Sequence, residues 1–292
     1  MPVRLSNIAI FNKKMSQTKY HNLMILIALA ICMISYLYIN MLLKTSSMEF
    51  YTPRTVTLEK KKYDVPFIVH EYWHSRRIPK LMSNVIKRLI ERNPEFDVYI
   101  YSEKEAVAFL QKHFDNDILE AYHGFKPSAF RSDLFRYCVL YIHGGIYIDT
   151  KIDFTVPLKD LIVDSKLVFP KTKDKWCNGK GVTNGFIIAP PKNHILLQTI
   201  KEIVINYKQR LYKNNNLHVT GPCLIGEILD KNNESEIRDN AICECSEENG
   251  VFIFRCNGKK VAQSYTEYRK EQNDMQKEPS YKILYDKHDI YW

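Results

Sequence analysis

The sequence contains little glycine and little proline, with only 10 and 12 residues of each type among 292. It also lacks internal repeats and any low-complexity segment beyond one short run of asparagines. These absences exclude collagen-like and disordered chains. The content of 45% hydrophobic and 26% charged residues is that of an ordinary globular protein. The length suits one domain of ordinary to large size with appendages.

The main part of the chain lacks a surplus of charge. The formal net charge is +9, but residues 1–22 carry +4 and residues 44–62 carry +3, which leaves +2 for all other residues. Proteins that bind a polyphosphate backbone need clustered lysine and arginine side chains. We therefore predict that the main domain does not bind nucleic acid.

Residues 23–43 lack any charged side chain. As a helix this run is about 30 Å long, the thickness of the bilayer's hydrocarbon core. The apolar part of a signal peptide is usually about 7–15 residues. An uncleaved anchor is therefore favoured over a signal peptide, and a buried core helix is disfavoured because the run is not amphipathic. Lysines lie closer before the run than after it, which favours a single-pass type II protein with residues 1–22 in the cytosol.

The region after the predicted span contains six of the seven cysteines, in the part expected to face the oxidising lumen of the Golgi or ER. The polar residues 44–64 are predicted to form a stem, and residues 65–292 the catalytic domain. Cys256 is expected to pair with Cys243 or Cys245, because only a short hairpin separates them. The spacing of Cys243 and Cys245 is too short for a zinc knuckle.

Strand and helix patterns alternate along the body. Short apolar runs at 65–70 and 96–101 predict buried strands. Apolar residues at helical spacing predict helices over 81–92, 103–113 and 117–122. Such alternation predicts an α/β layer fold with a largely parallel sheet.

The segment after Lys126 predicts a longer helix. Pro127 and Ser128 open it, with Ser128 as the N-cap, and Gly144-Gly145 ends it where glycine takes the left-handed conformation at low cost. Asp133 and Arg136 lie on one flank of this helix. Taken alone, these two residues are interpreted as a surface ion pair.

A strand over 146–154 is predicted to follow the two glycines. Its two-residue period places Asp149, Lys151 and Asp153 on one face. The helix, the glycine stop and the strand together deliver a carboxylate to the carboxyl edge of the sheet. Open α/β sheets bind ligands at that edge.

The same segment resembles a known family. The residues Ala-Phe-Arg-Ser-Asp-Leu-Phe-Arg-Tyr from 129 onward and Gly-Gly-Ile-Tyr-Ile-Asp from 144 onward are similar to the core of the glycosyltransferases that contain a DXD sugar-binding motif. This family includes initiating mannosyltransferases and inositol-phosphoceramide mannosyltransferases. Weaker matches extend the resemblance over residues 65–292, at Val65–Trp73, Ile78-Pro79, Asn93–Phe96, Thr183–Ile187, Thr220–Pro222 and His288–Trp292.

The resemblance implies a GT-A-like fold, with a Rossmann-type sheet flanked by helices and preceded by a single transmembrane helix. It implies retaining transfer of a hexose from a nucleotide-sugar, either GDP-mannose or a UDP-hexose, to a glycan, glycolipid or glycoprotein acceptor. The donor-binding residues implied by position are His70, Trp73, Asp133, Arg136, Tyr147, Asp149 and Trp292. The implied catalytic residues are Asp149, Lys151 and Asn184.

The DXD motif departs from the family pattern at its second aspartate. Two carboxylates one residue apart hold Mn²⁺ or Mg²⁺ against the donor diphosphate, but the triplet here is Asp149-Thr150-Lys151. In one arrangement Asp149, Asp153 and His288 rebuild a metal site. In a second, Lys151 neutralises the diphosphate itself. In a third, the site only binds.

The metal arrangement is slightly favoured, because Asp153 is predicted to share a strand face with Asp149 and the family's C-terminal His and Trp are present. Two functions follow from these alternatives. One is a membrane-anchored hexosyltransferase, and the other is a non-catalytic, membrane-anchored protein of the same fold that binds sugar-nucleotides or glycans. The presence of Asp133, Arg136 and Asp149 together favours the enzyme.

Overall fold

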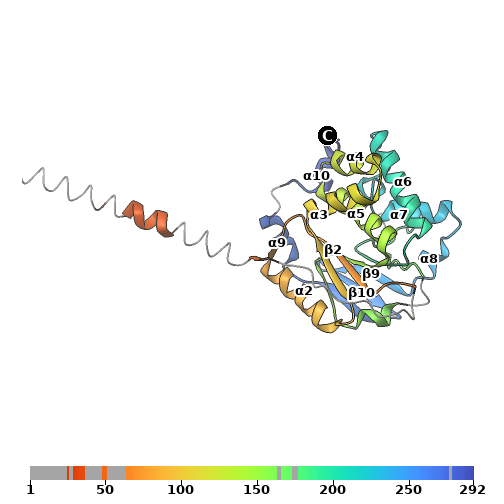
Figure 1. Cartoon of the computed structure of the whole chain (residues 1–292), viewed down its shortest axis with the longest axis horizontal. Helices are drawn as coiled ribbons and strands as arrows, with labels where there is room; N and C mark the ends of the chain where they lie inside the picture. Colours follow the sequence, from red (N-terminus) through yellow and green to blue (C-terminus); the bar gives the residue numbers. More distant parts are fainter. Residues whose placement is uncertain are drawn as a thin grey trace, which may run out of the picture. The chain divides into compact units, whose positions relative to one another are not determined.

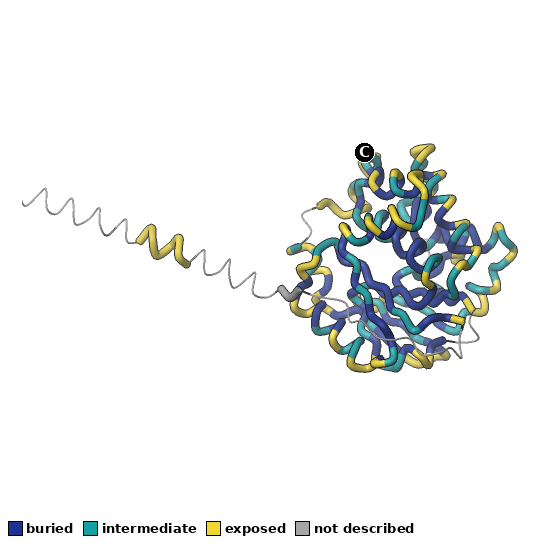
Figure 2. Tube along the Cα trace, viewed as in Figure 1, coloured by how far each residue is buried: buried dark blue, intermediate teal, exposed yellow. Residues whose placement is uncertain are grey.

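The computed structural model describes residues 25, 29–36, 48–50, 64–162, 166–172, 177–275 and 278–292. The chain divides into two units, residues 1–49 and residues 50–292. In the first unit residues 29–36 are helical and exposed (Figure 2). Over the described residues, no helix combines the length and the apolar character needed to span a bilayer. The predicted tail and most of the predicted span and stem lie outside the described residues.

Figure 1 labels helices α2 to α10 and strands β2, β9 and β10. The strands are β1 (Met48–Phe50), β2 (Ile68–Tyr72), β3 (Arg77–Pro79), β4 (Asp97–Tyr101), β5 (Gly145–Ile148), β6 (Ile152–Phe154), β7 (Lys171–Thr172), β8 (Phe186–Ala189), β9 (Cys243–Glu248), β10 (Val251–Cys256) and β11 (Lys259–Ser264). The helices are α2 (Lys80–Arg92), α3 (Glu103–His113), α4 (Asn116–Gly124), α5 (Ser128–His143), α6 (His194–Lys208), α7 (Pro222–Lys231), α8 (Glu236–Asp239), α9 (Tyr268–Met275) and α10 (Tyr281–Asp286), with 3-10 turns η1 (Leu158–Leu161) and η3 (Asn216–His218).

The second unit is built in layers around two sheets. Its described residues form a four-stranded sheet of order β4-β2-β5-β8 and a five-stranded sheet of order β6-β11-β10-β9-β7. In the first sheet β2 is parallel to β4 and β5, and β8 is antiparallel to β5. Every pair in the second sheet is antiparallel except β7 with β9.

One apolar core fills the space between the two sheets, where Val69 and Ile146 of the first sheet pack in a cluster with Phe154 and Phe254 of the second. The other face of the four-stranded sheet is covered by helices α3 to α7, which share a second core with residues such as Tyr147 (Figure 1). Helix α2 packs beside the second sheet and contacts β6. The arrangement is a mixed α/β fold in which the main strands are parallel.

The prediction of an α/β layer fold is confirmed, but the layers differ from those expected. A sheet flanked by helices was predicted, whereas helices α3 to α7 cover one face and the mainly antiparallel five-stranded sheet covers the other. The second sheet uses residues 243–264, for which no strands were predicted. Its hairpins are amphipathic, with one face buried against the first sheet and the other partly exposed.

The strand predicted over 146–154 is wrong as a single strand. The chain turns after Ile148, and the backbone N–H of Ile152 donates to the carbonyl of Asp149 at 2.9 Å. As a result β5 belongs to the four-stranded sheet and β6 to the five-stranded sheet. The turn ends the two-residue period, so Asp149 and Asp153 do not share a strand face.

The predicted end of the long helix is confirmed at the two glycines. Gly144 and Gly145 have φ angles of 64° and 98°, values that favour glycine. A Cβ on Gly145 would lie 2.4 Å from the carbonyl oxygen of Ile68 on β2, so the first residue of β5 approaches its neighbour as only glycine can. At the other end Pro127 is the N-cap and Ser128 is the first helical residue, one position from the prediction.

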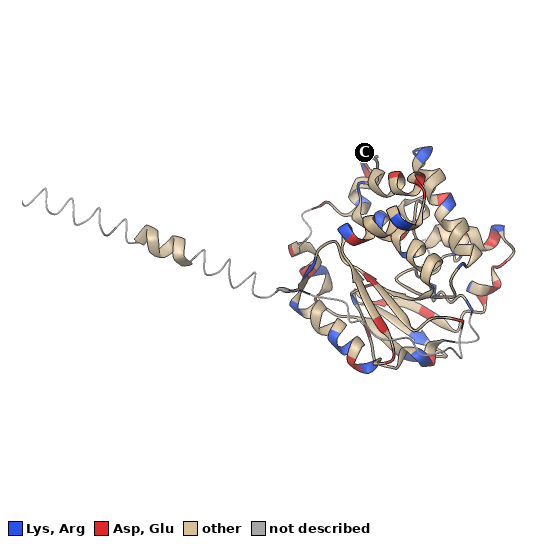
Figure 3. Cartoon of the chain, viewed as in Figure 1, with Lys and Arg blue, Asp and Glu red and all other residues tan. Residues whose placement is uncertain are grey.

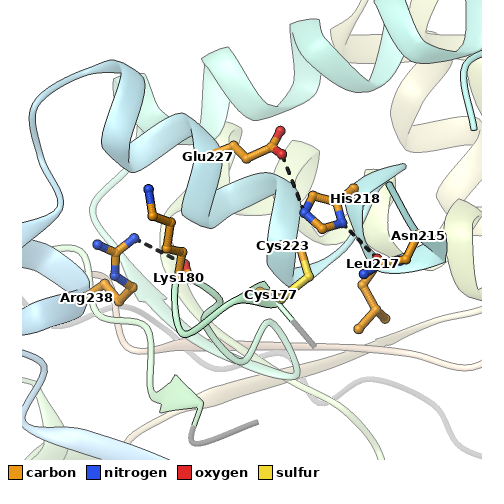
Figure 4. The surroundings of a disulfide bond; sticks show 8 residues. All are labelled: Cys177, Lys180, Asn215, Leu217, His218, Cys223, Glu227 and Arg238. Carbon is orange, nitrogen blue, oxygen red and sulfur yellow. Dashed lines mark hydrogen bonds and ion pairs between the residues drawn. A yellow bond between two sulfur atoms is a disulfide. The ribbon is translucent and has the colours of Figure 1, made fainter. Parts of the chain in front are cut away.

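Two disulfides cross-link the second unit. Cys243–Cys256 joins directly opposed residues of β9 and β10, which confirms one of the two pairings expected for Cys256. Cys177–Cys223 joins the loop before β8 to the first turn of α7 (Figure 4). This second pairing was not predicted, because 46 residues separate its cysteines in sequence.

Candidate active site

The carboxyl ends of the parallel strands β2, β4 and β5 meet at one edge of the four-stranded sheet. Trp73 follows β2 and Asp149 follows β5, while the antiparallel β8 begins at this edge just after Asn184 and Gly185. The backbone N–H of Asp149 donates to the carbonyl of Gly185 at 2.8 Å. A Cβ on Gly185 would lie 2.7 Å from Asp149 Oδ2, so a glycine here gives the carboxylate its room.

Asp149 lies between two cations. Its Oδ2 is 3.1 Å from Lys151 Nζ, and its Oδ1 is 3.5 Å from Arg136 Nη2. Burial opposes ionisation of this carboxyl, but the charges of Lys151 and Arg136 outweigh it and hold the pKa of Asp149 below its ordinary value. Asp149 is therefore ionised at neutral pH.

Lys151 is held in place by its anionic and aromatic neighbours. Its ammonium lies 5.1 Å from the ring centroid of Phe252 on β10 and 5.6 Å from that of Tyr268 on α9, which are cation–π distances. Burial lowers the pKa of Lys151, but the carboxylate of Asp149 outweighs this and raises it above the ordinary value. The ammonium is charged, and its side chain keeps 30% of its surface exposed.

Arg136 and Asp133 form the centre of a buried network, not the surface ion pair expected for them in isolation. Arg136 Nη2 is 3.0 Å from Asp133 Oδ1, and the two side chains are only 6% and 13% exposed. Asn184 Nδ2 donates to Asp133 Oδ1 at 3.0 Å, and Thr220 Oγ1 donates to Oδ2 at 2.8 Å. The guanidinium of Arg136 also donates to the carbonyl of Asn184 at 2.8 Å and lies 4.7 Å from the ring of Tyr147.

This network places three separate segments in fixed relation to one another. Burial raises the pKa of Asp133 more than the charge of Arg136 lowers it, and the hydrogen bonds from Thr220 and Asn184 favour the ionised form. The segments 183–185 and 220–222, singled out in the sequence as weak matches, thus meet the long helix at one carboxylate. Their hydrogen bonds fix side-chain positions before any ligand binds.

Two cavities open on this edge of the sheet, with volumes of about 370 and 440 Å³. The first is lined by Trp73, His74 and Met82, and the second by Asp133 and Asn184, among others. Seven residues line both cavities: Ala129, Arg136, Asp149, Lys151, Phe252, Arg269 and Tyr281.

The shared wall carries three cations, Arg136, Lys151 and Arg269, against the single carboxylate of Asp149. Elsewhere, charged residues of both signs occur along the helices and strands (Figure 3). Arg136 also pairs with Asp133, and Arg269 lies 3.8 Å from Glu247. The remaining N–H donors of the three cations can still meet an anionic ligand at this wall.

The Cys177–Cys223 disulfide, whose surroundings are drawn in Figure 4, contributes Cys177 to the lining of the second cavity. Cys177 lines this cavity and precedes the segment 183–185, while Cys223 follows the segment 220–222. Close by, Arg238 Nη1 donates to the carbonyl of Lys180 at 3.1 Å. The cross-link therefore ties together the two segments that hydrogen-bond to Asp133.

Two predicted donor-binding residues are buried away from the cavities. The His70 Nε2–H donates to the carbonyl of Gly144 at 3.0 Å, and the hydroxyl of Tyr101 donates to Nδ1 at 3.2 Å. Burial lowers the pKa of His70 to about 3, so the imidazole is neutral. Tyr147 lies under the guanidinium of Arg136. Both side chains support the site from behind and line neither cavity.

The remaining predicted residues are not brought to Asp149. Trp292 is 73% exposed, with the ammonium of Lys126 4.9 Å from its ring, and His288 packs against Tyr212 with ring centroids 4.7 Å apart. Asp153 accepts a 2.7 Å hydrogen bond from Arg88 Nη2. None of the three lines either cavity.

The predicted metal set of Asp149, Asp153 and His288 is therefore corrected. Nowhere in the described part of the chain do three His, Cys, Asp or Glu side chains form a group able to hold a metal ion. The turn at Asp149 separates the two aspartates. The groups placed on the Asp149 carboxylate are an ammonium and a guanidinium, which do not fit a divalent cation.

Sequence reasoning missed the wall formed by the C-terminal third of the chain. Phe252, Tyr268 and Arg269 line the cavities, yet they carry no motif and lie in elements that were not predicted. Only the three-dimensional approach of β10 and α9 to Lys151 reveals them. Trp73, Asp133, Arg136, Asp149, Lys151 and Asn184, by contrast, are all brought together as cavity-lining residues.

Comparison with known families confirms the resemblance drawn from the sequence. Residues 79–168 match the family described as "Glycosyltransferase sugar-binding region containing DXD motif". This range contains Asp133, Arg136, Asp149 and Lys151.

Among similar proteins, inositol phosphoceramide mannosyltransferase 1 of Schizosaccharomyces pombe is 22% identical over 142 residues, which are 48% of this chain and 43% of that protein. Mannosyl phosphorylinositol ceramide synthase SUR1 of Saccharomyces cerevisiae is 24% identical over 139 residues, 48% of this chain and 35% of that protein. The chain thus spans less than half the length of these relatives. The solved structure of PaToxG glycosyltransferase aligns with a TM-score of 0.46 and 18% identity, covering 57% of this chain and 69% of that one.

Proposed function

We propose that this chain, whose residues 79–168 carry the sugar-binding region of the DXD glycosyltransferases, is a membrane-anchored retaining hexosyltransferase with a GT-A-like domain. The donor is a nucleotide-sugar, and the acceptor is a hydroxyl of a glycan, glycolipid or glycoprotein. One observation carries the proposal. Two cavities of a size suited to small ligands meet at a wall of three cations and one carboxylate.

The two cavities divide the donor between them. The nucleoside occupies the first cavity, whose lining includes the aromatic residues Trp73, Tyr268 and Tyr281. Its diphosphate lies at the shared wall, near Arg136 and Lys151. The hexose enters the second cavity toward Asp133 and its hydrogen-bonded partners, and the rest of that cavity accepts the acceptor hydroxyl.

Catalysis in this arrangement is the stabilisation of a leaving group. The bond between C1 of the hexose and the phosphate oxygen breaks, and its electron pair leaves with the nucleoside diphosphate. A new bond forms between C1 and the acceptor oxygen, and the acceptor proton passes to the departing diphosphate. Arg136 and Lys151 donate hydrogen bonds to the oxygens that gain charge, and these groups are placed before the reaction begins.

Further features support a place in the secretory pathway. Two disulfides in the second unit suit an oxidising compartment, such as the Golgi or ER lumen. In the first unit, the helical residues 29–36 expose apolar side chains that include Leu29, Ile31 and Met33. Such side chains suit a lipid environment, which supports an anchor within residues 23–43.

The donor sugar proposed first is mannose. Both relatives described above are named for the transfer of mannose or for a mannosyl product. GDP-mannose is therefore the first donor to test, followed by UDP-glucose, UDP-galactose and UDP-N-acetylglucosamine.

The test is donor turnover by the full-length protein in detergent micelles. Release of GDP or UDP from each donor is measured with and without inositol phosphoceramide or a mannose oligosaccharide as acceptor. Release from one donor, lost in Asp149→Asn, is the expected result. Binding of a donor without any release of GDP or UDP would instead favour the non-catalytic sugar-nucleotide-binding protein. If none of the donors binds, the assignment of the site is wrong.

A further inference from the structure

The site handles an anionic leaving group, yet its second DXD position is a lysine. Building on the proposed function, we propose that the Lys151 ammonium, together with the Arg136 guanidinium, takes the role of the divalent cation that the DXD motif would hold against the donor diphosphate. Donor binding and cleavage are then independent of metal.

The first argument is the occupancy of the Asp149 carboxylate. One of its oxygens faces Lys151 at 3.1 Å and the other faces Arg136 at 3.5 Å. A metal ion on Asp149 would have to displace one of these cations and remain within a few ångströms of it. Like charges at that distance repel strongly in a poorly solvated wall.

The second argument concerns the other carboxylates near the site. Asp133 already accepts hydrogen bonds from Asn184 and Thr220 and pairs with Arg136. Glu71 on β2 is 1% exposed and lines neither cavity. Burial, followed by the charge of Asp149, raises the pKa of Glu71 to about 8. Two other carboxylates line the cavities, and each faces a guanidinium: Glu278 lies 4.0 Å from Arg131, and Glu247 lies 3.8 Å from Arg269.

The third argument is that Lys151 is already placed for a diphosphate. Its ammonium is held by Asp149 and lies close to the rings of Phe252 and Tyr268, at the junction of the two cavities. An ammonium has three donors, of which the Asp149 carboxylate needs one. The other donors are available to phosphate oxygens, as in other phosphate sites where lysine acts as a point charge.

In chemical terms Lys151 stabilises the diphosphate as it departs with the electron pair of the C1–O bond. The contribution of the lysine is the fixed charge itself. The substrate class that follows is a nucleoside-diphosphate sugar bound as the free anion, without the metal complex.

Two measurements on the wild-type protein test this directly. Binding of GDP and UDP is followed by calorimetry in EDTA and in 1 mM Mn²⁺, and Mn²⁺ binding is followed by electron paramagnetic resonance in the presence of the nucleotide. The expected result is nucleotide binding in EDTA that is no weaker than in Mn²⁺, with no signal from protein-bound Mn²⁺. Nucleotide binding that appears only with Mn²⁺ would overturn the inference and leave the proposed function intact.

Variants at position 151 sharpen the test. Lys151→Ala is expected to lower donor cleavage by about 10²–10³-fold, the usual loss for one charged stabiliser, and Lys151→Arg is expected to retain most of it. Lys151→Asp recreates the paired carboxylates, so its residual nucleotide binding is expected to require Mn²⁺ and to give a bound Mn²⁺ signal. The matched control is Lys159→Ala, a lysine that is 55% exposed and pairs with Glu95.

The melting temperature of each variant shows whether it is folded. A loss of activity in a variant that melts like the wild type is then due to the lost charge. A fully active and stable Lys151→Ala protein would contradict the inference. If no nucleotide binds to the wild type with or without metal, the proposed function itself fails, and this outcome is distinct from metal-dependent binding.

Discussion

Two aspartates four residues apart show how differently the two sheets of the second unit use the same side chain. Asp149 lies at the carboxyl edge of the four-stranded sheet, between Lys151 and Arg136 in the wall of two cavities. Asp153 lies on β6, the edge strand of the five-stranded sheet, and pairs with Arg88 of α2. The first site is preorganised for a ligand, and the second joins a helix to a sheet. The two side chains are about equally exposed, at 21% and 22%, so their partners distinguish the two roles, whereas burial and spacing in the sequence do not.

The largest expected effect is a loss of donor turnover when Asp149, but not Asp153, is replaced. Asp149→Asn keeps the shape of the side chain but removes the charge that orients Lys151 and Arg136, so donor turnover is expected to fall by at least about 10²-fold. Turnover is measured as release of nucleoside diphosphate.

The control for this variant is Asp153→Asn. The Arg88–Asp153 pair is partly exposed, at 41% and 22% of the two side chains, and surface ion pairs contribute about 0–1 kcal/mol. Asp153 lines neither cavity, so turnover is expected to stay within about twofold of wild type, with a small loss in the free energy of unfolding. Equal losses of turnover in the two variants would show that the contrast between the aspartates is wrong.

The next effect compares the two disulfides. Loop-closure entropy assigns about 3 kcal/mol to a cross-link like Cys243–Cys256 and about 4 kcal/mol to one that closes a longer loop like Cys177–Cys223. Replacing either pair by serines is expected to lower the free energy of unfolding, as measured in urea. Only the Cys177/Cys223 variant is expected to lose donor turnover as well, because that cross-link ties the two segments that hold Asp133. Turnover that is equal in both variants would remove this functional distinction.

The smallest effect concerns Glu71 in the four-stranded sheet. Its carboxyl oxygens have no hydrogen-bond partner among the described residues, and burial raises its pKa from 4.5 to about 8. Folding then keeps a proton that the unfolded chain loses, so the free energy of unfolding falls by about 1.4 kcal/mol per pH unit below the folded pKa. Between pH 6.5 and 8 the fall is at most about 2 kcal/mol. Glu71→Gln is expected to flatten this slope.

The comparison is cleanest between pH 6.5 and 8. His70, with its pKa lowered to about 3 from 6.5, contributes stability that is fully present above pH 6.5 and is lost only as the pH falls below it. Urea unfolding of the wild type and Glu71→Gln across this range measures the difference. Parallel slopes in the two proteins would show that Glu71 is ionised in the folded state.

Much of the fold was predictable because strands alternate with helices in the first half of the second unit, and each of these elements has a clear local hydrophobic pattern. Strands at β2 and β4, helices α2 to α4 and the glycine stop after α5 all follow from periodicity and from turn chemistry within short windows. The five-stranded sheet was missed because its strands pair through hairpins and through a distant strand, β6. No local period links residues 152–154 to 259–264.

The prediction of the site succeeded where its residues lie in one local motif. It failed where residues from distant parts of the chain are brought together by the fold. Asp133, Arg136 and Asp149 were identified from one helix–turn–strand segment. The metal set failed because a strand was assumed to continue through Asp149, and a single backbone turn carries Asp153 into the other sheet. Phe252 and Arg269 carried no signal, because aromatic and basic residues are common in any chain.

The close approach of Gly185 to Asp149 suggests a pattern for finding related sequences in other genomes. Because a Cβ at 185 would lie 2.7 Å from Asp149 Oδ2, a side chain there would displace the carboxylate from its place between Lys151 and Arg136. A search pattern that requires Gly-Gly-Ile-Tyr-Ile-Asp-Thr-Lys, then Asn-Gly just before an apolar strand, would therefore select chains with the same crowded carboxylate and the same lysine beside it. Such chains would form a subgroup in which a lysine side chain, and not a metal ion, supplies the positive charge beside the carboxylate. This grouping would not depend on the sugar that each donor carries.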